Sequence, residues 1–379
     1  MNFGVCRVKN IPPIDLARQY QSVGVAIESA VQSVLSSGRY IGGSAVSDFE
    51  GQFAEYVGVG ECVSCNSGTD ALFLALRALD IGSGDEVITT PFTFFATAEV
   101  ISAVGATPVF VDIEADTFNF NVEHLEAAIT PRTKAILPVH LFGQPVNMTR
   151  VMEIARSRDL AVIEDCAQAT GARWNDRPVG SIGHVGCFSF FPTKNLGAFG
   201  DGGAVTTNDR ALTEKMRVLK NHGATQRYYH EAIGVNSRLD ALQAVILLEK
   251  LPYLDKWNEA RQMVATRYQD LLAGVADIAR PQELDGGCSV WNQYTIRVAR
   301  DRDRLRDRLS ENGIGTGLYY PVPLHLQPVY RDLGYSPGQL PVVERICQEV
   351  LSLPMFPELT LEEQQYVATC IAQHPSVPR

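Results

Sequence analysis

The chain has 379 residues, of which 45% are hydrophobic and 20% charged, so it has room for a large core and a smaller second domain. This composition excludes disordered and fibrous classes of protein. The formal net charge of -10 argues against broad nucleic-acid binding, which needs a basic face, although helix N-termini and a few local cations can still hold an anionic small molecule.

No apolar run approaches the roughly 20 residues that a membrane helix needs, and Met1–Pro13 lacks the pattern of a signal peptide, so we expect a cytoplasmic protein. The eight scattered cysteines are then expected to be reduced and mostly buried. Cys62 and Cys65 have CxxC spacing, but no second pair or suitably spaced histidine accompanies them. We interpret the pair as small apolar residues of a strand, and we expect no metal site.

Short β-rich runs alternate with amphipathic runs through the first two thirds of the chain, which predicts a layered α/β fold with a mainly parallel sheet. Several of the β-rich runs are apolar throughout, as in strands covered on both faces. The predicted strands are Glu61–Ser64, Asp85–Thr90, Thr107–Val111, Ala135–Val139, Leu160–Glu164, Cys187–Phe190 and Gly203–Thr206. The predicted helices between them are Ala71–Leu79, Ala96–Val104, Val122–Ala128 and Met148–Arg158.

The pattern changes near residue 239. A long helical stretch, Leu239–Leu272, is interrupted near Leu251–Pro252, because proline cannot continue the hydrogen-bond ladder. Later segments predict a strand, a charged helix, a second strand and a last helix that begins with a capping box formed by Thr360 and Glu363. These are Trp291–Val298, Arg302–Glu311, Gly315–Tyr320 and a helix starting in Thr360–Glu363. We expect a large α/β domain over residues 1–250, with an N-terminal helical segment, and a smaller α+β domain over residues 251–379.

Asn66–Leu72 (NSGTDAL) follows a predicted strand and opens a predicted helix. A glycine-containing loop at a helix N-terminus leaves backbone N–H groups available to bind phosphate. The alternative is a simple cap, in which Ser67, Thr69 or Asp70 satisfies the first helical turn.

Asp165 follows the apolar strand directly, at the strand end where ligands bind in α/β sheets. A carboxylate there could pair with a protonated pyridine nitrogen of a cofactor. The alternative is a helix cap or an ordinary salt-bridge partner.

Lys194 lies in the segment SFFPTKNLG, among Phe190, Phe191 and Phe199. Partial burial would lower its pKa and make the amine a usable nucleophile for a carbonyl carbon, whereas an isolated lysine is usually solvated. The glycines at 200–203 do not give the GxGxxG spacing of a dinucleotide loop.

Six motifs in this order resemble those of the DegT/DnrJ/EryC1/StrS sugar aminotransferase family. They are NSGTDAL, PFTFFAT, EDCAQATG, SFFPTKNLGAFGDGGA, HGATQRYYH and GVNSRLDALQA, and the likeness runs from Pro13 to Met355. The resemblance implies a fold-type I enzyme dependent on pyridoxal 5'-phosphate (PLP), which moves an amino group from L-glutamate, through the pyridoxamine form of the cofactor (PMP), to a keto sugar nucleotide. The C-terminal region, with Trp291–Val298, is most similar to members that aminate C3 of a UDP- or dTDP-linked sugar.

The resemblance also implies roles for individual residues. Lys194 would hold the cofactor covalently and carry the proton, while Asp165 would bind the pyridine nitrogen. Gln168 would face the phenolic oxygen of the cofactor, and Phe94 would cover its ring. Gly68, Thr69 and Ser189 would bind the phosphate.

Further residues are implied at the substrate side. Asn236 would reach the phosphate of the neighbouring subunit and Arg238 would lie near the substrate, so the resemblance implies a homodimer with shared active sites; turn formation and helix capping are their alternatives. Tyr319, Tyr320 and His325 would line the sugar pocket, although His325 could equally be a packed histidine.

Two other functions remain open on the same scaffold. A PLP-dependent sugar dehydratase is one, but its known relatives carry histidine in place of the lysine, so Lys194 counts against it. A non-catalytic regulatory or binding protein is the other, and the intact set of Lys194, Asp165 and Gln168 counts against that.

Overall fold

The computed structural model describes residues 10–373, whose centre is a seven-stranded sheet. Its strands in spatial order are β1 (Glu61–Cys65), β9 (Gly203–Thr207), β8 (Val185–Ser189), β5 (Ala161–Asp165), β4 (Thr133–Ile136), β2 (Glu86–Thr89) and β3 (Thr107–Phe110). The strands from β8 to β3 are parallel, whereas β9 is antiparallel to both of its neighbours. The carboxyl ends of β1, β8, β5, β4 and β2 therefore meet at one edge.

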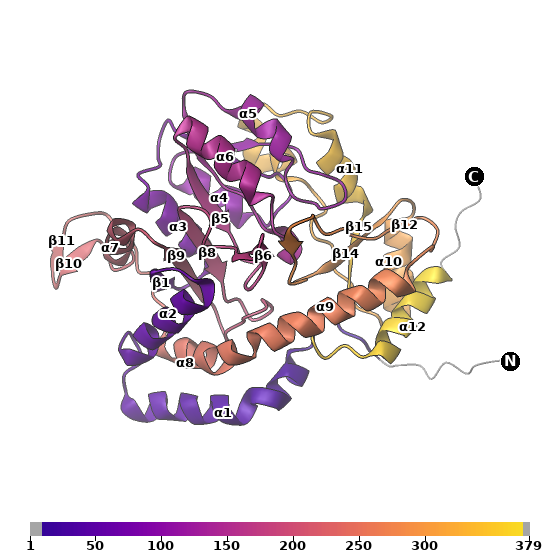
Figure 1. The fold of residues 1–379 in the computed structure, drawn as a ribbon, viewed down its shortest axis with the longest axis horizontal. Helices are drawn as coiled ribbons and strands as arrows, with labels where there is room; N and C mark the ends of the chain where they lie inside the picture. The colour runs from indigo at the N-terminus through magenta and orange to yellow at the C-terminus, as the bar shows by residue number, and fades with distance from the viewer. Residues whose placement is uncertain (1–9, 374–379) are drawn as a thin grey trace.

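Helices cover this sheet, as the alternating sequence pattern predicts (Figure 1). They are α1 (Leu16–Ser37), α2 (Ser44–Val57), α3 (Gly68–Ala78), α4 (Ala96–Ala103), η1 (Val122–His124), α5 (Leu125–Ala128), η2 (Leu141–Gly143), α6 (Met148–Arg158), α7 (Arg210–Leu219) and α8 (Ala241–Lys250). A small sheet joins β6 (Arg173–Trp174), β7 (Arg177–Pro178) and β13 (Gly287–Cys288). The hairpin of β10 (Ala224–Gln226) and β11 (Tyr229–His230) projects beyond α7 at one end of the molecule (Figure 1).

The C-terminal part has its own core, built around Tyr268 and Tyr294. Its elements are η3 (Leu251–Tyr253), α9 (Leu254–Leu271), β12 (Ile278–Ala279), β14 (Tyr294–Val298), α10 (Arg302–Glu311), η4 (Leu324–Leu326), η5 (Pro328–Leu333), α11 (Pro341–Glu349), β15 (Val350–Leu353) and α12 (Leu361–Ala372). Ile11 also packs in this core and pairs with Ile314, so the first described residues contact the C-terminal unit before the chain enters α1.

Helices α8 and α9 form the predicted long helical stretch, with the interruption at η3, where Pro252 lies. Helix α8 packs on α1 and α2, and α9 packs on α12 (Figure 1). The predicted boundary between the two domains, at residue 250, falls at this interruption, and the division into these two domains stays a prediction. In the part of the chain that the structure describes, no helix combines the length and the apolar composition of a membrane span.

The predicted strand at Gly315–Tyr320 is wrong. Gly317 makes a single bridge to Ser352, and the chain then leaves the sheet, where Pro321 and Pro323 have no N–H to donate. The strand that pairs with β14 is β15, whose four residues are all buried. The apolar run of β15 was not assigned from the sequence.

The capping box of α12 forms as predicted. The Thr360 hydroxyl accepts from the Glu363 N–H at 3.2 Å, and the Glu363 carboxylate accepts from the Thr360 N–H at 2.9 Å. The same carboxylate binds Arg18, which ties α12 to α1.

We expect Thr360→Ala to lower the free energy of unfolding by about 1 kcal/mol, because the Glu363 N–H loses its cap. Urea unfolding followed by circular dichroism measures the change. Thr369→Ala on the same helix is the control, since that hydroxyl binds only an exposed carbonyl within the helix, and its effect should stay within about 0.5 kcal/mol. Equal losses in the two variants would contradict a stabilising role for the cap.

Candidate active site

The loop between β1 and α3 offers backbone N–H groups to an anion. Ser67 is the N-cap of α3: its hydroxyl accepts from the Asp70 N–H at 3.1 Å and its carbonyl accepts from the Ala71 N–H at 3.0 Å. This cap leaves the N–H groups of Gly68 and Thr69 at the start of the helix. The simple-cap alternative and the phosphate site are therefore compatible, because they use different N–H groups.

Gly68 also lets Ser189 come close. A Cβ on Gly68 would lie 2.6 Å from the Cβ of Ser189, so any larger residue would push the end of β8 away. The small residue, the serine hydroxyl and the helix N-terminus form a cradle of hydrogen-bond donors of the kind that binds phosphate. The sequence placed Gly68, Thr69 and Ser189 in one site, and the structure brings them together.

Asp165 ends β5 and is buried at the same edge of the sheet. One carboxylate oxygen accepts from the Thr97 hydroxyl at 2.9 Å and the other from the Ala167 N–H at 3.1 Å. Burial raises the pKa of Asp165, while these two hydrogen bonds and the charge of Lys194 act in the opposite direction. The carboxylate is thus held in one orientation. Thr97 belongs to PFTFFAT, but no local pattern singles it out.

Lys194 lies in the loop that follows β8, and its N–H donates to the Phe191 carbonyl at 2.9 Å. Burial lowers the pKa of its amine to about 8, although the nearby Asp165 raises it. The expected aromatic surroundings are only partly present: Phe190 packs in the core, whereas Phe191 and Phe199 are about half exposed. The desolvation of the amine therefore does not depend on all three rings.

Gln168 is oriented from both ends of its amide. Its oxygen accepts from the Phe142 N–H at 2.7 Å, and its nitrogen donates to the Tyr320 hydroxyl at 3.2 Å. Burial raises the pKa of Tyr320, so this phenol keeps its proton at neutral pH. Tyr320 thereby joins the site from the C-terminal part of the chain.

Aromatic rings surround Tyr320. Phe94 lies 6.4 Å from it between ring centroids and is 59% exposed, which leaves one face available to a ligand. Tyr319 lies 5.9 Å from Tyr320 and lines a small cavity with Thr193, the residue before Lys194. Phe94, Tyr319 and Tyr320 are thus brought near the predicted cofactor residues.

His325 does not join them. Its side chain is fully buried, lies 5.7 Å from Tyr335 between ring centroids, and binds the Glu344 carboxylate at 3.3 Å. Burial lowers its pKa. The structure agrees with the packed-histidine alternative. Within the described chain the His325 ring is buried and is not accessible to a ligand.

Asn236 and Arg238 lie at the base of the projecting hairpin. Asn236 is exposed and pairs with Asn221, and the Arg238 guanidinium donates to the Asn221 side chain at 2.7 Å. Neither caps α8, whose N-cap is Asp240, so the helix-capping alternative is wrong. Neither residue lies in a turn, and within the described chain their contacts are the bridge and the hydrogen bond to Asn221.

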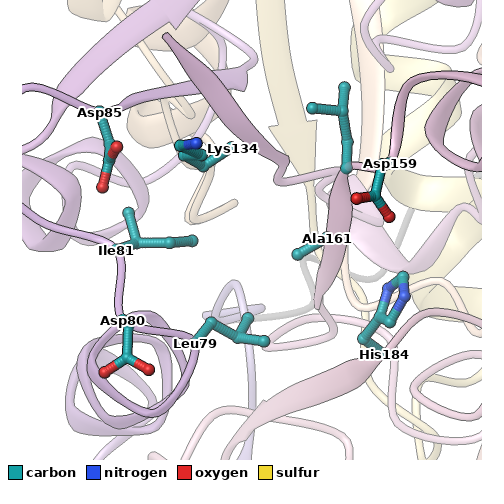
Figure 2. A pocket seen from close by; sticks show the side chains of 9 residues that line it. Leu79, Asp80, Ile81, Asp85, Lys134, Asp159, Ala161 and His184 are labelled. Atoms are coloured by element: carbon teal, nitrogen blue, oxygen red, sulfur yellow. The ribbon is translucent and has the colours of Figure 1, made fainter.

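The open groove of Figure 2 lies at the opposite edge of the sheet. It is lined by Asp85, Lys134, Ala161 and His184, which precede or begin strands, whereas ligands in α/β sheets bind beyond the carboxyl ends. His184 and Asp85 are already used there, as acceptors from backbone N–H groups. We do not assign the active site to this groove.

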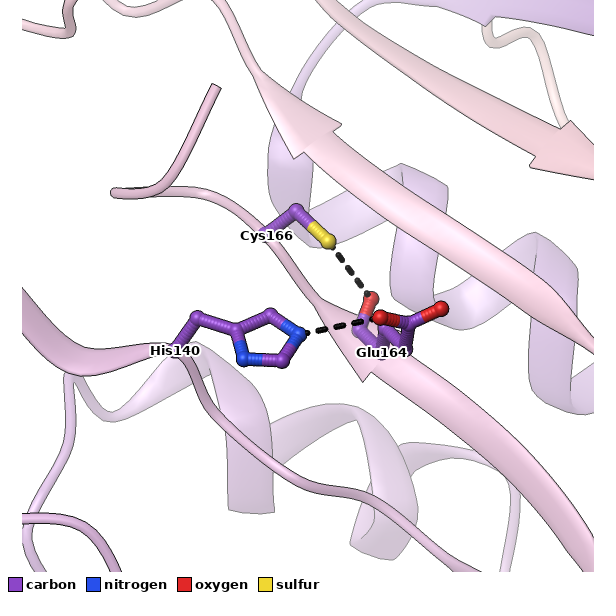
Figure 3. A group of neighbouring side chains, drawn as sticks. All are labelled: His140, Glu164 and Cys166. Carbon is purple, nitrogen blue, oxygen red and sulfur yellow. Dashed lines mark hydrogen bonds and ion pairs between the residues drawn. The ribbon is translucent and has the colours of Figure 1, made fainter. Parts of the chain in front are cut away.

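His140, Glu164 and Cys166 cluster in the interior as three residue types that can bind metals (Figure 3). The Nδ1 of His140 accepts from the Val146 N–H at 3.1 Å, so the proton is on Nε2, which donates to Glu164 at 3.1 Å. The Glu164 carboxylate also accepts from the N–H groups of three residues: Gly180, Ile182 and Gly183. Since these lone pairs are occupied, we interpret the cluster as a structural hydrogen-bond network. Cys62 and Cys65 are buried thiols of β1, as the strand interpretation predicts.

The sequence was also compared with known proteins. The model of the DegT/DnrJ/EryC1/StrS aminotransferase family matches residues 21–372. The chain is 50% identical to a pleiotropic regulatory protein of Geobacillus stearothermophilus, over 96% of this chain and 98% of the relative. It is 46% identical to UDP-N-acetyl-3-dehydro-alpha-D-glucosamine 3-aminotransferase of Acidithiobacillus ferrooxidans, over 95% and 97%.

Solved structures agree with these relatives. DesV of S. venezuelae, in complex with a ketimine intermediate, superposes with a TM-score of 0.94 at 43% identity and covers 97% of this chain and 100% of that one. NtdA of Bacillus subtilis, with bound cofactor PMP, gives a TM-score of 0.88 at 31% identity over 97% and 86%. The fold-type I architecture predicted from the sequence is confirmed, and this chain belongs to the DegT/DnrJ/EryC1/StrS aminotransferase family.

Proposed function

We propose that this protein is a PLP-dependent aminotransferase that moves an amino group from L-glutamate to C3 of a keto sugar linked to UDP or dTDP. The observation that carries the proposal is the meeting of the Lys194 amine, the Asp165 carboxylate and the Gly68–Ser189 cradle at one edge of the sheet. The relative that acts on a UDP-linked 3-dehydro sugar supports the position of amination. A cytoplasmic location remains a prediction.

The residues fit the cofactor by their chemistry. The Gly68 and Thr69 N–H groups and the Ser189 hydroxyl would hold the phosphate, and Asp165 would accept a hydrogen bond from the pyridine nitrogen. Gln168 would turn its amide nitrogen, which now binds Tyr320, towards the phenolic oxygen. The exposed face of Phe94 would cover the ring. PLP held there supplies an electron sink and carries the nitrogen between the two half-reactions.

Lys194 then has two tasks. As a neutral amine it is the nucleophile that holds the cofactor, and its lowered pKa makes this form accessible near neutral pH. Its Nζ would also take a proton from the donor carbon in the first half-reaction and give a proton to the sugar carbon in the second, for which a pKa near the working pH is well suited. Tyr319 and Tyr320 would line the sugar side of the site.

Lys194 and Asp165 also bear on the two alternative functions. A sugar dehydratase is disfavoured by Lys194, as the family resemblance implies. A regulatory role deserves a direct test because one relative is named a pleiotropic regulatory protein. Against a purely regulatory protein stands the cost of keeping the Asp165 carboxylate buried and the half-buried Lys194 amine desolvated, since desolvated ionisable groups destabilise a fold unless they are compensated.

The function is tested by incubating the holoenzyme with L-glutamate and a panel of UDP- and dTDP-linked keto sugars, with mass spectrometry of the products. We expect an amino sugar nucleotide from a 3-keto substrate, together with 2-oxoglutarate. Matched 4-keto sugars are the control for position. Loss of a sugar hydroxyl without gain of nitrogen would favour the dehydratase, and no product from any sugar would favour the regulatory protein.

The pKa of Lys194 gives a second prediction. Apoprotein mixed with PLP should gain a visible absorption band at a rate that rises with pH and levels off above about 8. The reason is that only the neutral amine attacks, and burial shifts its deprotonation below the ordinary value of 10.5. Stopped-flow absorbance measures the rate. Lys194→Ala should gain no such band, and a rate that still climbs towards pH 10.5 would contradict the lowered pKa.

The homodimer with shared sites leads to a third prediction. Asn236 is exposed at the base of a hairpin that projects from the molecule and carries exposed Tyr228 and Tyr229 (Figure 1). If Arg238 serves the site of the neighbouring subunit, Lys194→Ala and Arg238→Ala should each be inactive, and their mixture should regain activity. A hybrid dimer contains one site with both residues intact. Subunit exchange is verified by native mass spectrometry with one variant isotope-labelled; exchange without activity would place Arg238 in its own chain's site.

A further inference from the structure

One side chain from a distant helix joins the two loops that carry the predicted catalytic residues. Asn258 lies on α9. Its oxygen accepts from the Asn195 amide at 2.7 Å, and Asn195 is the residue after Lys194. Its nitrogen donates to the Thr170 carbonyl at 3.1 Å, in the loop that follows Asp165. A single amide therefore spans the gap between these loops.

The bridge leaves little room for adjustment. A Cβ on Gly171, the glycine that ends EDCAQATG, would lie 2.5 Å from the Asn258 amide nitrogen. A glycine is therefore needed for α9 to approach this loop. Its φ of +95° favours glycine as well. The contact explains a glycine that the cofactor residues alone do not require.

Asn195 is held on its other sides too. It is 3% exposed, its nitrogen also donates to the Val290 carbonyl at 2.9 Å, and its oxygen accepts from Asn292 at 2.8 Å. A buried amide whose hydrogen bonds are all made has one favourable orientation. The position of the Lys194 backbone is therefore set by partners from α9 and from the segment before β14.

We propose that Asn258 is a positioning residue, which fixes the separation of Lys194 from Asp165 by bridging their loops. This rests on the proposed function, in which Lys194 and Asp165 act on one cofactor. The hydrogen bonds of Asn258 go to Asn195 and to the Thr170 carbonyl rather than to Lys194 or Asp165, so it acts through the loops. Its effect follows from distance: the interaction of two charges and the alignment of a reacting amine both change steeply over an ångström.

The test compares Asn258→Ala with Gln269→Ala in the holoenzyme. Gln269 is a matched control, because it is an amide on the same helix that donates to a backbone carbonyl, that of Pro281, at 2.7 Å. For Asn258→Ala we expect kcat to fall by about tenfold or more while the KM for the sugar nucleotide changes little. The pH at which the visible absorption band of the bound cofactor is half-changed, its pH midpoint, should also differ from that of the wild type. Gln269→Ala should change neither kcat nor this midpoint.

A second variant separates hydrogen bonding from packing. Asn258→Leu keeps most of the volume and removes the bridge, so it should match Asn258→Ala in kcat and in the pH midpoint. Thermal unfolding of each apoprotein checks the fold. A wild-type kcat and pH midpoint in either folded variant would overturn the proposal, as would a raised KM with unchanged kcat. If Lys194→Ala kept the visible band, the lysine assignment would fail instead.

Discussion

The electrostatic coupling of the Lys194 amine to the Asp165 carboxylate is the interaction on which the proposed site depends. Asp165 is buried and Lys194 is half-buried, and the loss of hydration raises the pKa of the aspartate and lowers that of the lysine, while each group partly offsets the change in the other. They come within electrostatic reach because β5 and β8 are parallel neighbours with Asp165 opposite Cys187. The loops that follow two adjacent parallel strands leave the sheet side by side.

The neighbouring residue Glu164 stabilises the position of β5 through hydrogen bonds on the opposite face of that strand. Successive side chains of a strand point to opposite faces, so Glu164 turns away from the site when Asp165 turns towards it. Its buried carboxylate accepts from His140 and from three N–H groups of the segment 180–183. The network of Figure 3 thus anchors the strand that presents Asp165, and its lone pairs are used in doing so.

The predicted cofactor residues come together within one chain, whereas the hairpin near Asn236 points away from them. Gly68, Asp165, Gln168 and Lys194 meet within the chain, where hydrogen bonds hold the Asp165 carboxylate, the Gln168 amide and the backbone of Lys194. The hairpin near Asn236 projects away from the molecule, and its Tyr228 and Tyr229 stay largely exposed although the neighbouring Arg227 guanidinium lies over the Tyr228 ring. This contrast is the physical basis for proposing a second subunit, because apolar rings on a projecting hairpin are costly to leave in water.

Local signals in the sequence determined most of the elements. Helices α6 and α10 have their predicted bounds, and the capping box of α12 forms, because caps and apolar periodicity act within a few residues. The order of the motifs, through the family resemblance, predicted that Lys194, Asp165 and Gln168 share one site. The tertiary structure alone decided that β15 rather than Gly315–Tyr320 pairs with β14 and that His325 is buried against Glu344. It also decided the side-chain contacts of the site: Thr97 with Asp165, Tyr320 with Gln168, and Asn258 with the Thr170 carbonyl. These contacts join residues 19 to 152 positions apart, and no local pattern specifies them, since they depend on how whole elements pack.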